Sequence, residues 1–206
     1  MLRDGPAGLL SMRANPALPR RHADGAVEAD VLAVEIAVGD HRMRELRIFF
    51  RAAEALRSAT GATAGVTLHV EKRLPMGGGL GGGSSDAATT LMALNRLWHT
   101  GLDSLQLQHI GLALGADVPV FIHGRTVFAE GVGEHFTDLS LPAAWYLVLV
   151  PGVAVPTQEI FRSPDLRRDT VPIAAADWRP GFGCNDLETV ACSLYPEIAR
   201  HLDWLR

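Results

Sequence analysis

The chain has 206 residues, 48% of them hydrophobic and 20% charged, with a formal net charge of −4 at pH 7. These proportions predict a soluble globular protein with a real core, in one large domain or two small ones. The charge gives no electrostatic reason to expect a nucleic acid or an anionic membrane as partner. No apolar run reaches the roughly 18 residues of a membrane span, and the apolar centre of the opening MLRDGPAGLLSMR is too short for a secretory signal.

Cysteine and histidine give no sign of a metal site. The two cysteines are Cys184 and Cys192. We expect them to be reduced, buried thiols of a cytoplasmic protein, and the alternative is a disulfide between them. The eight histidines are scattered, without an HxxxH or HxH pair. We therefore expect no metal-ligand cluster.

The first clear elements lie between residues 27 and 98. Residues 27–40 have strand-like apolar content, and residues 40–61 are typical of a helix that ends at Gly61. Residues 66–70 alternate apolar and polar side chains, which predicts a half-buried strand. A helix follows, with one apolar face and with Ser84 or Ser85 as its N-cap; the face is made of Ala87, Leu91, Leu94 and Trp98.

The later elements are predicted from their apolar runs and their turn residues. Residues 103–115 predict a helix that stops at a glycine. Residues 117–122 and 126–134 indicate a pair of strands joined by the turn residues HGR. The run AWYLVLVPG, residues 144–152, predicts a buried strand, and residues 185–205 predict one late helix.

Six glycines occupy the seven positions from Gly77 to Gly83, between the strand at 66–70 and the helix after it. Without Cβ atoms, several backbone N–H groups can converge on one anion, and the helix adds its own unpaired N–H groups and the positive end of its dipole. A flexible linker is the alternative, but this run is short and lies between two periodic elements. The pattern therefore predicts a loop that binds a polyphosphate.

Neither of the two common phosphate loops fits this segment. The GxxxxGK[ST] loop requires a lysine after its last glycine, and none is present. The GxGxxG pattern matches formally at Gly77, Gly79 and Gly82, but glycines this dense satisfy almost any glycine pattern. The dinucleotide fold also needs a strand that ends in an acid about 20 residues on, where this chain has HTGLDSLQLQ.

The segment PMGGGLGGGSSDAA resembles the P-x-x-x-G-L-G-S-S-A-A phosphate loop of the galactokinase, homoserine kinase, mevalonate kinase and phosphomevalonate kinase superfamily. The segments KRLPMGGGLGGGSSDAAT, LGADVPVFIHG, FAEGVGE, WYLVLVPGVAVPTQEIF and NDLE resemble, in this order, successive parts of one of its branches. That branch phosphorylates a cytidine diphosphate-linked methylerythritol. The resemblance covers roughly residues 51–206.

The resemblance implies an α+β, two-subdomain small-molecule kinase fold. Its N-terminal part, residues 51–144, would be ribosomal protein S5 domain 2-like, with a left-handed βαβ phosphate-binding unit. Residues 145–206 would form an incomplete ferredoxin-like C-terminal part. Residues 1–50 remain an atypical, unassigned segment.

The implied reaction is the ATP-dependent phosphorylation of the 2-hydroxyl of 4-diphosphocytidyl-2-C-methyl-D-erythritol, in non-mevalonate isoprenoid (terpenoid) biosynthesis. It would use ATP and Mg²⁺, in the cytoplasm, with this small molecule as partner and with the protein as a monomer or homodimer. Two alternatives remain: another small-alcohol kinase of the superfamily, and a non-catalytic ATP-binding remnant.

The resemblance also implies roles for individual residues. Asp117 would be the catalytic base, and the alternative is an aspartate that caps a turn before Pro119. Thr157 and Phe161 would lie on the cytidine side, with ordinary core packing as the alternative for the ring. The expected ATP-binding residues are Lys72, Pro75, Met76, Gly77, Gly78, Gly79, Leu80, Gly81, Gly82, Gly83, Ser84 and Ser85.

Two charged residues near the loop are open to more than one interpretation. For Lys72 the alternative to a place near the nucleotide is a solvated lysine at a strand end. Asp86 either interacts with the helix dipole or contributes to a Mg²⁺ shell. We expect no metal ligand set made by the protein alone.

The chain departs from the family pattern at both ends. The family opens with a P-A-K-[IL]-N motif whose lysine pairs with the catalytic aspartate, and this sequence has no lysine before Lys72. The segment RRHADG, residues 20–25, only partly matches the family's R-x-D-G-[YF]-H. The family's closing G-[ST]-G-[AG] loop does not occur before Arg206. The hypotheses are frame disruptions near residue 50 and near the end, a gene remnant, or an unusual homologue.

Overall fold

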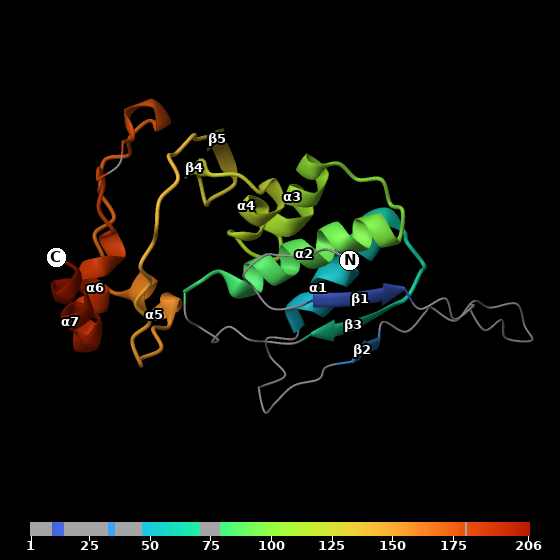
Figure 1. Ribbon diagram of the computed structural model, residues 1–206, viewed down its shortest axis with the longest axis horizontal. Helices are drawn as coiled ribbons and strands as arrows, with labels where there is room; N and C mark the ends of the chain where they lie inside the picture. Colours follow the sequence, from blue (N-terminus) through green and yellow to red (C-terminus); the bar gives the residue numbers. More distant parts are fainter. Residues whose placement is uncertain (1–9, 15–32, 36–46, 71–78, 180) are drawn as a thin grey trace, which may run out of the picture. The chain divides into compact units, whose positions relative to one another are not determined.

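The computed structural model describes residues 10–14, 33–35, 47–70, 79–179 and 181–206. Its contacts divide the chain into two units, and each is described by itself (Figure 1). In the described ranges the first unit takes in residues up to 70 and 81–139, and the second takes in residues 79–80 and 140–206.

The helices and strands have the following bounds. They are β1 (Leu10–Ala14), β2 (Ala33–Glu35), α1 (Arg47–Thr60), β3 (Val66–Val70), α2 (Gly82–Leu97), α3 (Ser104–Leu112), α4 (Val118–His123), β4 (Val127–Glu130), β5 (His135–Asp138), α5 (Thr157–Arg162), the 3₁₀ turn η1 (Ala175–Asp177), α6 (Asp186–Leu194) and α7 (Pro196–Leu205).

The first unit has a three-stranded sheet in the order β1-β3-β2. The central strand β3 pairs antiparallel with β1 and parallel with β2, so that Leu68 is opposite both Met12 and Val34. Val66 and Leu68 are buried. The strand predicted from the alternation at 66–70 is confirmed.

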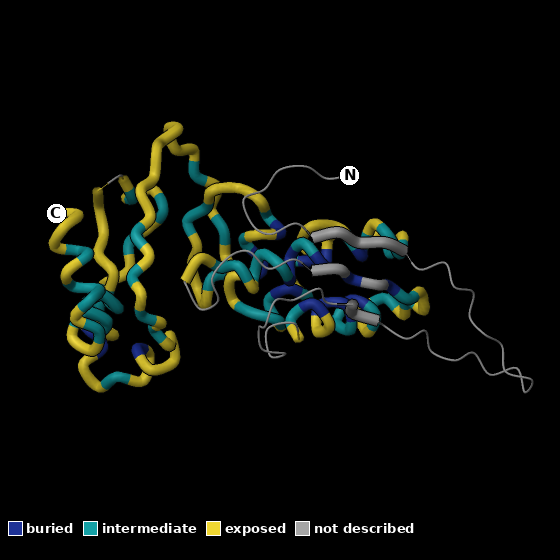
Figure 2. Tube along the Cα trace, turned by 60° about the horizontal axis from the view of Figure 1, so that its bottom comes forward, coloured by how far each residue is buried: buried dark blue, intermediate teal, exposed yellow. Residues whose placement is uncertain are grey.

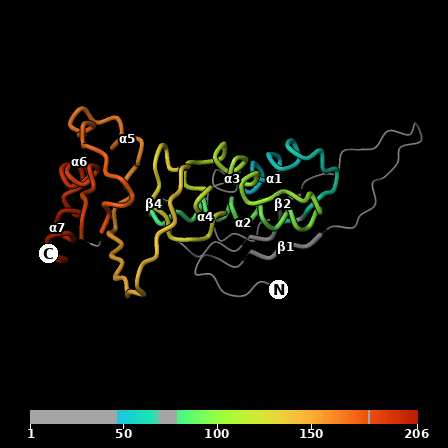
Figure 3. The backbone as a smooth tube through the Cα atoms, turned by 90° about the horizontal axis from the view of Figure 1, so that it is seen from above, coloured from blue at the N-terminus to red at the C-terminus, as the bar shows by residue number. Residues whose placement is uncertain are grey.

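Helices α1 and α2 lie beside this sheet (Figure 3). They supply most of the buried apolar residues of the core. In α1 the buried residues recur at the spacing of one helical face, and they are Phe49, Ala52, Ala53 and Leu56. In α2 the predicted face is confirmed at Ala87, Leu91 and Leu94, while Trp98 is partly buried against the same core. Buried residues gather along these helices in Figure 2.

The expected end of α1 is also confirmed. The helix stops at Thr60, and Gly61 takes a left-handed conformation with φ of 70°. Its N–H donates to the carbonyl of Arg57 over 2.8 Å. Glycine adopts this backbone conformation without the steric penalty of a Cβ, which is why helices commonly stop there.

The strand predicted at residues 117–122 is wrong, because this segment forms the short helix α4. Its buried residues Val118, Pro119 and Ile122 follow helical spacing, and Gly124 ends the helix with φ of 70°. An apolar run of this length does not separate a buried strand from a buried helix, whereas proline in the first turn and a glycine cap favour the helix. The observed strand pair is β4 with β5, antiparallel.

The second unit contains α5, η1, α6 and α7, with a small core of Ile160, Leu166 and Val190. The buried strand predicted at residues 144–152 is wrong. The segment has no regular secondary structure, and Trp145 and Tyr146 are among its exposed side chains. An apolar run becomes a buried strand only where a partner supplies hydrogen bonds and an apolar face, and no strand in the described ranges pairs with it.

The single late helix predicted at residues 185–205 is divided into α6 and α7. The break lies at Tyr195, whose φ of −128° and ψ of 83° are not helical. Pro196 follows directly, and its ring disfavours the helical conformation for the residue before it. Asn185 caps α6 by accepting a hydrogen bond from the Leu187 N–H over 3.0 Å.

Two general predictions can be compared with these elements. In the described ranges no helix is long and apolar enough to cross a membrane. Both cysteines are free thiols, as expected, but Cys184 is exposed and so is not the buried thiol that was predicted. Cys192 is partly buried, and this burial raises its pKa.

Candidate functional site

The site begins at the N-terminus of α2, directly after the glycine loop. The N-cap is Gly81, in the left-handed region with φ of 67°, so the predicted N-cap at Ser84 or Ser85 is wrong. Both serines lie in the first turn, and the Ser85 N–H donates to the Gly81 carbonyl over 2.9 Å. The helix begins earlier because Gly81 readily takes the positive φ that turns the chain into it.

This helix end presents backbone donors. The N-cap residue Gly81 makes no side-chain capping hydrogen bond, and the first N–H groups of a helix have no partner within the helix. Those of Gly82, Gly83 and Ser84 are therefore suited to an anion, and the helix dipole adds partial positive charge. Lys72, Pro75, Met76, Gly77 and Gly78, which were also predicted to bind ATP, lie outside the described residues.

The turn before α4 lies against this helix end. A Cβ placed on Gly115 would be 3.9 Å from the hydroxyl oxygen of Ser84. Asp117 follows two residues later at the N-cap position of α4, is exposed, and makes no capping hydrogen bond with its side chain. The structure thus brings Ser84 and the turn that carries Asp117 together, although more than 30 residues separate them in the sequence.

A third segment reaches the same turn. A Cβ on Gly133, in the β4–β5 turn, would lie 3.5 Å from the carbonyl oxygen of Ala116. Within that turn the Glu134 carboxylate accepts the Val132 N–H over 2.7 Å. We call residues 81–85, 115–117 and 131–134 the three-segment site. It combines helix N–H donors, a serine hydroxyl and an exposed carboxylate.

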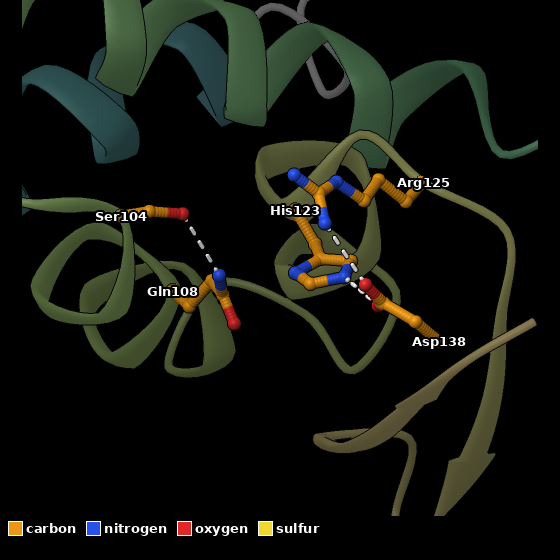
Figure 4. Close-up of polar contacts among 5 residues, drawn as sticks. All are labelled: Ser104, Gln108, His123, Arg125 and Asp138. Carbon is orange, nitrogen blue, oxygen red and sulfur yellow. Dashed lines mark hydrogen bonds and ion pairs between the residues drawn. The ribbon is translucent and has the colours of Figure 1, made fainter.

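The last residue of α4, His123, contacts Asp138 of β5 (Figure 4). The Asp138 carboxylate lies 2.6 Å from Nε2 of His123 and accepts a hydrogen bond from Nη1 of Arg125 over 3.0 Å. The hydrogen bond with His123, followed by the one from Arg125, lowers the pKa of Asp138. Phe136 also lies beside the imidazole, with 5.2 Å between ring centres.

This contact was missed in the sequence, which indicated only a turn histidine at position 123. No local pattern links His123 to a carboxylate fifteen residues away. Figure 4 also shows the hydrogen bond from Gln108 to Ser104, 3.0 Å long, which joins two exposed side chains one helical turn apart in α3. Of these two contacts, only that of His123 ties α4 to another element.

The two residues expected on the cytidine side belong to the second unit. Thr157 is the first residue of α5, and Phe161 is on the same helix with 53% of its surface exposed. The ring of Phe161 is therefore not part of the small core around Ile160. Arg168 fixes the end of this helix by donating to the carbonyl of Phe161 over 2.6 Å.

In the described part of the chain, no group of three or more His, Cys, Asp or Glu side chains could hold a metal ion. The oxygens at the helix end are those of Ser84, Ser85 and Asp86. They could supply only part of a cation's coordination shell, so that a bound substrate would have to supply the rest.

A glycine segment that leads into a helix N-terminus, beside a turn with an exposed carboxylate, is suited to binding phosphate next to a carboxylate. Residues 47–125 match the family model described as the GHMP kinases N terminal domain. This match indicates the GHMP kinase family.

Several relatives support this. The 4-diphosphocytidyl-2-C-methyl-D-erythritol kinase of Dechloromonas aromatica is 59% identical over 156 residues, which cover 76% of this chain and 57% of that protein. The enzyme of that name from Halorhodospira halophila is 50% identical over 189 residues, covering 90% and 64%. The chain thus spans somewhat more than half the length of these curated relatives.

A solved structure agrees with the sequence comparison. The crystal structure of a 4-(cytidine 5'-diphospho)-2C-methyl-D-erythritol kinase matches with a TM-score of 0.63 at 31% sequence identity. The match covers 94% of this chain and 76% of that one. The chain therefore belongs to the GHMP kinase family and, within it, to the 4-diphosphocytidyl-2-C-methyl-D-erythritol kinases, so the family predicted from the loop and its flanking segments is confirmed.

Proposed function

We propose that the chain catalyses the ATP-dependent phosphorylation of the 2-hydroxyl of 4-diphosphocytidyl-2-C-methyl-D-erythritol, in non-mevalonate isoprenoid biosynthesis. Family membership supports the substrate, since relatives over 50% identical bear the name of this kinase. The observation that carries the proposal is the approach of Ser84 to the turn that holds Asp117. It brings a phosphate-binding helix end beside a carboxylate.

The chemistry asks little of the protein beyond position and charge. The hydroxyl oxygen of the substrate attacks the γ-phosphorus of ATP, the bond from that phosphorus to the β-phosphate oxygen breaks, and ADP leaves. Asp117 accepts the hydroxyl proton, as a general base within reach would. The N–H groups at the start of α2 stabilise the negative charge on the phosphate oxygens.

We extend the ATP site to Lys72 and to residues 75–85, which include the described Gly79, Leu80, Gly81, Gly82, Gly83, Ser84 and Ser85. Mg²⁺ would screen charge between the phosphates when it is bound. Ser84 and Ser85 fit the mode in which one or two protein oxygens share such an ion with substrate phosphates. Asp86, one residue on, could contribute through water.

The exposed ring of Phe161 supports a role in stacking on the cytosine base, with Thr157 as a polar contact on the same helix. We also propose that residues 51–144 form the nucleotide-binding subdomain, with a ribosomal protein S5 domain 2-like fold. Residues 145–206 would belong to a ferredoxin-like second subdomain. A monomer or homodimer in the cytoplasm is the expected state.

A turnover assay tests the proposed function. Purified chain is incubated with MgATP and, separately, with the cytidine diphosphate-linked alcohol, homoserine or mevalonate, and ADP release is followed. We expect release with the first alcohol only, and a loss of about 100-fold or more in Asp117→Asn. The control Asp165→Asn changes an exposed aspartate of the second unit and should keep the wild-type rate.

Each other outcome is informative. Release with homoserine or mevalonate alone would assign the chain to another small-alcohol kinase of the family. Binding of ATP without ADP release on any of the three alcohols would leave a nucleotide-binding protein without this activity. Full activity in Asp117→Asn would remove the carboxylate from the mechanism.

A further inference from the structure

We propose that Phe121 is a positioning residue for the phosphate loop: its ring fixes the N-cap of α2 relative to α4, the helix whose N-cap is Asp117. This inference rests on the proposed function, because it concerns the same nucleotide site. It adds a residue that contacts neither the nucleotide nor the alcohol in that proposal.

The contact is made at Gly81. A Cβ on this residue would lie 2.8 Å from Cζ of Phe121, closer than real Cβ atoms approach another atom, and 3.1 Å from Cε2, which is also a tight contact. The two other loop glycines for which the space has been described, Gly79 and Gly83, have nothing within 4 Å of such a Cβ. Among these three glycines, only Gly81 has its space filled by another side chain.

The helix that carries the Phe121 ring is closely packed. Val118 and Ile122 of the same helix are buried, and a Cβ on Gly111 of α3 would lie 2.8 Å and 2.9 Å from their side chains. Helix α4 is thus packed closely against α3. Phe121 follows Asp117 by four residues, so that the two lie near each other on one face of the helix. Helix α4 thus carries the ring that contacts Gly81, and its N-cap is the proposed catalytic base.

Core burial alone does not explain this ring. Phe121 keeps 36% of its surface exposed and is not a member of the apolar cluster formed by Val118 and Ile122 with α1, α2 and β3. Its tip instead meets a backbone position next to the proposed phosphate donors. A shift of that position would change where the N–H groups of Gly82 and Gly83 point, while the rest of the core stayed in place.

The test compares binding of MgATP with binding of adenosine by calorimetry, because only MgATP uses the phosphate donors. Phe121→Tyr adds a hydroxyl at Cζ, the atom nearest Gly81, and so displaces the N-cap. We expect its Kd for MgATP to rise about tenfold, with the Kd for adenosine unchanged. Two further variants replace the ring by a long or by a short apolar side chain. Phe121→Met keeps a similar reach and should bind MgATP more tightly than Phe121→Ala, which removes the contact. The matched control, Phe50→Tyr, changes a phenylalanine of α1 that is 45% exposed, and should behave as wild type.

A double-mutant cycle then tests the contact itself. Gly81→Ala introduces both an unfavourable positive φ and a clash with the ring, whereas Gly79→Ala, at φ of 70°, introduces the φ penalty only. Gly81→Ala should therefore weaken MgATP binding more than Gly79→Ala does. Combined with Phe121→Ala, the effect of Gly81→Ala should shrink, while that of Gly79→Ala stays the same.

The outcomes separate this inference from the function on which it rests. A wild-type chain that does not bind MgATP refutes the proposed function, and the positioning role with it. A wild-type chain that binds MgATP, with Phe121→Tyr unchanged or with equal losses for MgATP and adenosine, refutes the positioning role alone. Strict additivity of Gly81→Ala and Phe121→Ala would overturn it as well.

Discussion

The packing of α3 on α4 can be tested with a single methyl group, through Gly111→Ala. Gly111 is buried, and its Cβ would lie 2.8 Å from Cγ1 of Val118 and 2.9 Å from Cδ1 of Ile122. Both neighbouring side chains are themselves buried, so that neither can move aside without disturbing the core. The added methyl must therefore push α4 away from α3, and Asp117 moves with α4.

Two opposing contributions set the change that Gly111→Ala makes in the free energy of unfolding. Alanine favours a helix over glycine by about 1 kcal/mol, whereas overpacking a filled core costs about 1–3 kcal/mol. The free energy of unfolding should therefore fall by up to about 2 kcal/mol. Gly83→Ala is the matched control, since Gly83 is also helical and its Cβ would meet nothing within 4 Å. The free energy of unfolding of Gly83→Ala should rise by up to about 1 kcal/mol.

The assay is urea unfolding followed by far-ultraviolet circular dichroism. Val118→Ala should lower the free energy of unfolding less in the Gly111→Ala chain than in the wild type, because it removes the atom that the new methyl meets. Equal stability gains in Gly111→Ala and Gly83→Ala would refute the close contact between α3 and α4. Strict additivity of Gly111→Ala and Val118→Ala would refute it too.

Three further predictions concern the first unit. Leu91→Ala should lower the free energy of unfolding by about 2–5 kcal/mol, whereas Met92→Ala, at a 38% exposed position, should change it little in the same urea titration. Asp138 has a lowered pKa when folded, so it stabilises the fold above its unfolded pKa of about 3.9, and this contribution is lost as pH falls through the lower folded value. In His123→Gln the pKa of Asp138, followed by NMR, should rise and the acid-side loss of stability should shrink; an unchanged pKa would contradict the contact. Gly61→Ala should lower the stability of the fold by about 1–2 kcal/mol in thermal unfolding, because Gly61 has a positive φ. A rise in stability would contradict the left-handed conformation of Gly61.

The elements that the sequence predicted well are those whose periodicity extends over several residues. The alternation at 66–70 and the apolar face of 87–94 each repeat often enough to separate strand from helix. Residues 117–122 are too short for that, and the structure has a helix there. Residues 144–152 show a different limit: an apolar run reports a tendency to be buried, but the partner that would bury it is not encoded in the run.

The sequence indicated separate parts of the candidate site but not how they come together. The glycine loop and the resemblance indicated Ser84 and Asp117, and the structure describes both. Nothing local in the sequence indicates that Gly115 lies beside Ser84, because that approach depends on how α3 and α4 pack. The ring of Phe121 against Gly81 and the pair His123–Asp138 are likewise tertiary contacts between separate segments.

Two of these contacts, at Phe121 and His123, are made by α4, a helix of only six residues, and Gly115 lies in the turn just before it. A helix this short is not stable by itself, so its position is set by its neighbours: α3 on its buried side, Gly81 at the ring, and β5 at its last residue, His123. Changes at these three contacts should therefore alter the position of Asp117 more than changes of equal volume in α1, which has fourteen residues and its own apolar face. If the proposed kinase reaction is correct, turnover should be most sensitive to packing around α4, even where no residue touches the substrate.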